Sequence, residues 1–141
     1  MTGVSWQVWA LLSAVFAALT AIFAKLGVQT IDSDLATLLR TLIIAVVLAL
    51  FLSVKGGWET MSGLTTHAAG FLVLSGLATG ASWVCYFRAL KIGDASRVAP
   101  IDKLSVVIVA ILGVLLLGES LSTMHWLGVA LIGTGAIMLA L

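Results

Sequence analysis

Charged residues are scarce in this chain of 141 residues. Seven Lys or Arg and six Asp or Glu make up only 9% of the sequence, whereas 62% is hydrophobic. A soluble domain has about 25% charged residues, so this chain could not cover a water-facing surface without large apolar patches. The shortage of charge predicts an integral membrane protein. The net charge of +1 also gives no basic surface for a nucleic acid.

Cysteine is also scarce, with Cys85 as its one occurrence. A single cysteine excludes an internal disulfide framework and a Cys-based zinc cluster, and no second ligand stands at metal spacing from His67. GxSxG, HExxH, CxxC and P-loop motifs are all absent. We therefore expect no enzyme, no bound metal and no cofactor. No Lys or Arg precedes the first apolar run, so we expect no cleavable signal peptide.

Long apolar runs are abundant, and five of them reach the roughly 20 residues that a membrane-spanning helix needs. They predict an all-α five-helix transmembrane bundle that forms one domain over residues 1–141. Asp32, Ser33 and Asp34 are each able to cap the second span. Pro100 falls in the first turn of the fourth, where its missing N–H costs nothing, and Gly93 follows the third as a C′ glycine. The predicted spans are about 5–28, 33–54, 68–90, 97–118 and 123–141.

The basic residues are unevenly divided between the two sides of the predicted membrane. Lys55 is the one basic residue on one side, and the other six lie on or near the opposite side. The positive-inside rule then predicts an external N-terminus and a cytoplasmic C-terminus. The six are Lys25, Arg40, Arg88, Lys91, Arg97 and Lys103.

Asp102 and Lys103 lie about one and a half turns into the fourth predicted span. Charges at such depth are costly and usually functional. Neither residue has an oppositely charged neighbour at helical spacing, so the partners are expected on other helices. Arg40 either snorkels to the surface or points inward and pairs. The resulting network either clamps helix ends or gates a path. The candidate pairs are Asp102 with Arg40 or Lys25, and Lys103 with Asp32 or Asp34.

The middle thirds of all five predicted spans lack Asp, Glu, Lys, Arg and His. A cavity there would suit a neutral or amphipathic solute better than a highly charged one. The candidate lining residues are Thr79, Ser82, Trp83 and Tyr86. Small residues predict close helix packing, most clearly in the GxxxG pattern of Gly76 and Gly80. Gly128 and Gly133 are further candidate packing positions.

Three phrases resemble a known family: DSDLATLLRT, YFRALKIGDASRVAPIDKLSVV and LGESLS. They look like the short, single-repeat EamA-domain proteins of the drug/metabolite transporter superfamily, and the resemblance covers essentially the whole chain. Typical members of the wider family have ten spans in two inverted halves, and this chain resembles one half. The resemblance implies an inner-membrane transporter, of bacterial type, that moves a small metabolite or lipophilic compound by alternating access. A non-transporting membrane subunit or assembly partner is the alternative.

The chain is similar in scale to the small multidrug resistance proteins, which carry an essential glutamate in their first helix. The first predicted helix here has no acidic residue, so their proton-antiport mechanism does not carry over. Five helices are few for a closed pathway, so we expect an oligomer. The family's inverted halves suggest an antiparallel homodimer, whereas the Lys/Arg count argues against dual topology. Three arrangements stay open: a parallel homodimer, pairing with an inverted partner chain, and a charge bias that the cell overrides. We expect a homodimer and assign it no orientation.

Overall fold

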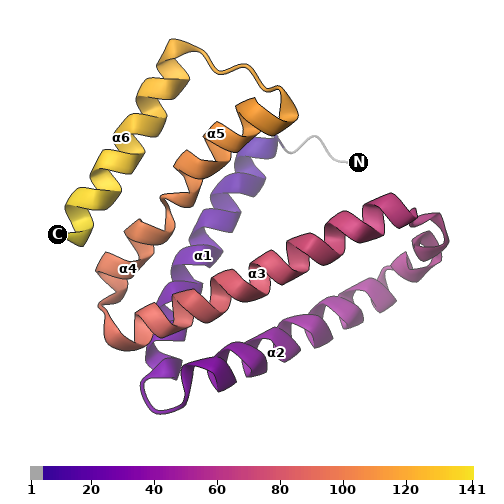
Figure 1. Cartoon of the computed structure of the whole chain (residues 1–141). Helices are drawn as coiled ribbons and strands as arrows, with labels where there is room; N and C mark the ends of the chain where they lie inside the picture. Colours follow the sequence, from indigo (N-terminus) through magenta and orange to yellow (C-terminus); the bar gives the residue numbers. More distant parts are fainter. Residues whose placement is uncertain (1–4) are drawn as a thin grey trace. The chain divides into compact units, whose positions relative to one another are not determined.

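The computed structural model describes residues 5–141, and every regular element in that range is helical (Figure 1). The five predicted spans are confirmed as helices long and apolar enough to cross a bilayer. The all-α fold class is therefore confirmed. The elements are α1 (Trp6–Val28), α2 (Ser33–Val54), the short 3₁₀ helix η1 (Gly57–Gly63), α3 (Thr66–Ile92), α4 (Ala95–Asp102), α5 (Ser105–Leu117) and α6 (Thr123–Ala140).

Large hydrophobic side chains cover the outside of these helices. Trp6 is 75% exposed, Phe51 56% and Leu117 76%. Such surfaces would aggregate in water, whereas a bilayer solvates them. The backbone polar groups of each span are satisfied within its own helix, which is what a hydrocarbon environment requires.

The helix ends follow local capping signals. The Asp32 carboxylate accepts hydrogen bonds from the backbone N–H groups of Asp34 and Leu35, so it is the N-cap of α2. Gly56 follows the C-terminal end of α2 with a left-handed φ of 67°. Ser122 caps α6 in a capping box with His125. Gly93 directly follows α3, at the predicted C′ position, and its φ is not among the positive values.

The fourth span differs from its prediction. It begins at Ala95 rather than near Arg97, so Pro100 lies in its second turn instead of its first. The helix is then interrupted at Lys103 and Leu104: the Lys103 N–H is shared between the carbonyls of Ala99 and Pro100, and the Leu104 N–H bonds to the carbonyl of Ile101. Pro100 lacks the N–H that would bond the Ser96 carbonyl, so it weakens the helix on the N-terminal side of this break. The charged pair Asp102 and Lys103 therefore stands at a helix break.

The chain forms two compact units. One comprises residues 24–91, in which α2 and α3 run antiparallel and are joined by η1 (Figure 1). The other comprises the described part of residues 1–23 together with Ile92–Leu141. In this second unit both α4 and α5 pack against α6. Gly133 is buried there, and a Cβ built on it would lie 3.2 Å from Cγ2 of Val107.

Candidate functional site

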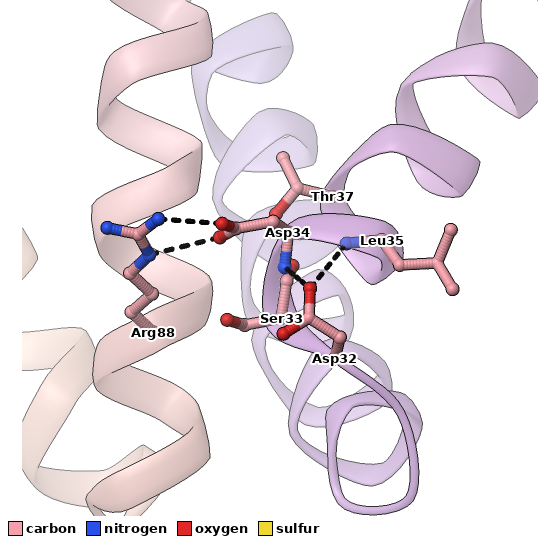
Figure 2. Close-up of polar contacts among 6 residues, drawn as sticks. All are labelled: Asp32, Ser33, Asp34, Leu35, Thr37 and Arg88. Carbon is pink, nitrogen blue, oxygen red and sulfur yellow. Dashed lines mark hydrogen bonds and ion pairs between the residues drawn. The ribbon is translucent and has the colours of Figure 1, made fainter.

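A bidentate ion pair joins the start of α2 to the end of α3. Nε of Arg88 donates to Oδ1 of Asp34 at 3.0 Å, and Nη2 donates to Oδ2 at 2.6 Å (Figure 2). Asp32, two residues earlier, is occupied by its capping role, so it leaves Asp34 free to face Arg88. The Arg88 and Asp34 side chains are 61% and 50% exposed. An ion pair this exposed is easily exchanged for contacts with water, so it suits a contact that has to break and re-form.

Two lysines strengthen the same corner of the unit formed by residues 24–91. Nζ of Lys91, at the end of α3, donates to the carbonyl of Ile31 at 2.6 Å. Nζ of Lys25, near the end of α1, donates to the carbonyl of Leu90 at 2.7 Å. Both acceptors lie at or beyond helix ends, where carbonyls lack helical partners. We call Lys25, Asp34, Arg88 and Lys91 the corner cluster; it ties the last turns of α3 to the junction of α1 and α2.

Buried side chains accompany the corner cluster. Val28 and Leu90 are fully buried, and Phe87 is 3% exposed. Two buried polar residues, Ser33 and Thr37, lie in the first turns of α2, and the Thr37 hydroxyl donates to the Ser33 carbonyl at 2.8 Å. Among residues 5–141 no buried side-chain nitrogen or oxygen lacks a hydrogen-bond partner. The corner is thus an apolar contact with exposed charges around it.

Arg40 lies against α3. Its guanidinium carbon is 3.4 Å from the centroid of the Trp83 ring and 5.9 Å from that of Phe87. Trp83 in turn makes edge-on contacts with Tyr86 and Phe87, at centroid distances of 5.6 and 5.7 Å. A guanidinium over an indole face is a favourable cation–π arrangement. Within residues 24–91 the guanidinium thus contacts an aromatic face rather than a carboxylate, and both predicted alternatives for Arg40 stay predictions.

Asp102 and Lys103 contact each other. Nζ of Lys103 is 3.1 Å from Oδ2 of Asp102, and the two side chains are 55% and 36% exposed. The partner of Asp34 is Arg88, which is not among the partners predicted for Asp34. The predicted pairs of Asp102 with Arg40 or Lys25, and of Lys103 with Asp32 or Asp34, would join the two units and stay predictions.

Antiparallel register is the signal by which Arg88 could have been found. Asp34 is the second residue of α2, and Arg88 lies four residues before the end of α3 at Ile92. Two antiparallel helices joined by a short connection bring such positions to the same end. The hairpin therefore predicts the Asp34–Arg88 pair once both helices are recognised.

The predicted cavity and packing positions lie mainly along α3 and α6. Thr79 donates its hydroxyl to the Ser75 carbonyl at 2.8 Å, and Trp83 and Tyr86 are in ring contact. Apart from the neighbouring residues and backbone of the same helix, no described atom lies within 4 Å of a Cβ built on Gly76, Gly80 or Gly128. A lining role for Thr79, Ser82, Trp83 and Tyr86 stays a prediction.

Comparison with known proteins gives one family and one close relative. The EamA-like transporter family matches residues 4–141. A protein of Sinorhizobium sp. described as "Uncharacterized transporter in cobO 3'region" is 62% identical over 136 residues, which are 96% of this chain and 96% of the relative. No solved structure matches. The match covers all five spans and leaves out only the first three residues.

Proposed function

Because the chain belongs to the EamA-like transporter family, we propose that it moves a small metabolite or lipophilic compound across a bacterial inner membrane by alternating access. The family assignment and five apolar helices make it a multi-pass membrane transporter. The observation that carries the finer proposal is the corner cluster. Exposed ion pairs and lysine–carbonyl contacts stabilise one arrangement only modestly, so they permit a second one.

The corner cluster is proposed to close one end of the pathway. Arg88 and Asp34 separate when that end opens, and Lys25 and Lys91 release their carbonyls. The positive-inside rule favours a cytoplasmic location for this end, since Lys25, Arg88 and Lys91 all lie there. The N-terminus is then external and the C-terminus cytoplasmic.

The interruption of the fourth span supports the same proposal. Transporters often use discontinuous helices, because a break in the helical hydrogen bonds gives a hinge inside a rigid span. Here the break follows Pro100 and coincides with Asp102 and Lys103. We propose that α4 and α5 change their mutual angle there during transport. The Asp102–Lys103 contact would then exchange for one of the predicted interhelical pairs.

Five helices are few for a closed pathway, so the proposed transporting unit is a homodimer. The charge bias favours parallel copies over dual topology, and an inverted partner chain is the alternative to the homodimer. A reporter fused to the C-terminus tests the topology. A signal from a periplasmic reporter alone would overturn the cytoplasmic placement of that end.

Flux into proteoliposomes tests the transport proposal. Purified protein is reconstituted, and uptake of a panel of labelled neutral, anionic and cationic amphipathic solutes is measured against protein-free vesicles. We expect saturable, protein-dependent uptake of at least one solute. If no member of the panel enters faster than into protein-free vesicles, the chain fits a non-transporting subunit instead.

A further inference from the structure

Arg40 is a cation well inside a membrane span. It follows the start of α2 at Ser33 by about 10 Å along the helix axis. Its stacking partner, Trp83, precedes the end of α3 at Ile92 by about 13 Å. A hydrocarbon core is about 30 Å thick, so Arg40 lies near one third of its depth and Trp83 between one third and one half. A charge at that depth is costly unless it is neutralised, and such charges are usually functional.

The structure gives each of the neighbouring cations a polar acceptor, whereas Arg40 lies against aromatic rings. Lys25 and Lys91 donate to backbone carbonyls, and Arg88 donates to a carboxylate. Within the unit of residues 24–91, Arg40 makes no hydrogen bond and no ion pair; its contacts there are with the faces of Trp83 and Phe87. Its side chain is also partly exposed.

Stacking uses the face of a guanidinium and leaves its edge available. The five N–H donors of arginine lie in the plane of the group, and their fork matches the two oxygens of a carboxylate or phosphate. Trp83, supported at its edge by Tyr86 and Phe87, fixes the plane of that fork. The same rings offer apolar surface beside the anion site. The arrangement therefore suits an oxyanion attached to an apolar body.

We propose that the Arg40 guanidinium, stacked on Trp83, binds the oxyanion of an amphipathic ligand such as an aromatic carboxylate. The inference rests on the proposed function and names its substrate class. A phospholipid headgroup presents the same chemistry, so the experiment separates a soluble anion from a lipid.

Equilibrium dialysis with radiolabelled benzoate and benzamide tests the site. The two probes have nearly the same shape, and only benzoate is charged. Protein in phosphate-free dodecyl maltoside is expected to bind benzoate saturably and benzamide at least about tenfold more weakly, since charged hydrogen bonds are the stronger ones. Equal affinity for the two probes, or no saturable benzoate binding, would overturn the proposal.

Substitutions at Arg40 and Trp83 test whether benzoate binds at this pair of side chains. Arg40→Gln should lower benzoate affinity about tenfold or more, and Arg40→Lys should recover only part of it, because lysine keeps the charge but loses the fork. Trp83→Leu should weaken binding as well. Arg97→Gln is the matched control and should leave the affinity unchanged. If Arg97→Gln weakens binding as much as Arg40→Gln, the effect is one of general charge and the site is wrong.

Two further measurements identify which anion competes for the Arg40 guanidinium. Should Asp102→Asn tighten benzoate binding about tenfold, Asp102 occupies the guanidinium and the proposal fails. If added phosphatidylglycerol displaces benzoate from the wild-type protein, the natural anion at this site is a lipid headgroup; if benzoate stays bound, it is a soluble one. Binding without flux would contradict the transport proposal alone, whereas flux of neutral solutes without benzoate binding would contradict this site alone.

Discussion

Asp32 provides the most direct test of how the corner of residues 24–91 is built. One of its carboxylate oxygens accepts the backbone N–H groups of Asp34 and Leu35, at 2.9 and 3.1 Å. Asp32→Ala leaves both donors without a protein acceptor. Loss of such a cap costs about 1 kcal/mol, within a range of about 0.5–2 kcal/mol. The negative charge at the helix start adds about 0.3–1 kcal/mol.

Asp32→Asn separates these two contributions. Asparagine retains the accepting oxygen and loses only the charge, so it should cost about 0.3–1 kcal/mol, while Asp32→Ala should cost about 1–2 kcal/mol. The free energy of unfolding is measured by titrating the purified protein in mixed micelles with dodecyl sulfate and following helix content. Ser122→Ala, which removes the cap of α6, is a matched control at another helix and should cost about 1 kcal/mol.

The consequence for the corner cluster can be read in the same variants. Asp34 is in the first turn of α2, so fraying of that turn displaces the carboxylate that Arg88 binds. Arg88→Gln should therefore destabilise the Asp32→Ala protein less than it destabilises the wild type. In the Asp32→Asn background, Arg88→Gln should cost as much as it does in the wild type. If Asp32→Ala is as stable as the wild type, or Asp32→Asn is as unstable as Asp32→Ala, the capping account is refuted.

Three further changes probe the ion pair, the α5–α6 contact and the helix break. Asp34→Arg or Arg88→Asp alone should lower the midpoint of thermal unfolding, and the double swap should restore most of it; two additive losses would mean that the pair is not coupled. Gly133→Leu should cost about 1–3 kcal/mol in the dodecyl sulfate titration, because the added side chain meets Val107, with Gly133→Ala costing less; an unchanged Gly133→Leu would contradict the α5–α6 contact. Pro100→Ala restores a helical N–H, so it should raise the unfolding midpoint and slow flux; flux equal to that of the wild type would mean that Pro100 has no part in the proposed hinge.

The spans follow from the sequence because their signals are local. The predicted range 33–54 agrees with α2 at both ends, where Asp32 supplies a cap and Lys55 and Gly56 stop the helix. Apolar length alone fixes α1 and α6 to within a residue. In a hydrocarbon solvent the backbone has few alternatives to a helix, and this restriction makes such predictions succeed.

The contacts between helices depend on register and side-chain direction, which apolar length does not contain. Asp34 has several basic candidates at the same end of the bundle, and only the antiparallel placement of α2 and α3 selects Arg88. Arg40 stacks on Trp83 because two helices bring these side chains to the same depth. The break at Lys103 likewise depends on how hydrogen bonds rearrange after Pro100, and composition does not report this.

Crosslinking the corner cluster tests whether this end of the pathway opens during transport. In a Cys85→Ser background, Asp34→Cys and Arg88→Cys are joined by a short bis-methanethiosulfonate reagent, and flux of an identified solute is measured before and after reduction. A transporter whose end opens at this corner should lose at least about tenfold in flux when crosslinked and regain it on reduction, while either single cysteine variant treated with the same reagent stays active. Full flux in the crosslinked protein would contradict the account.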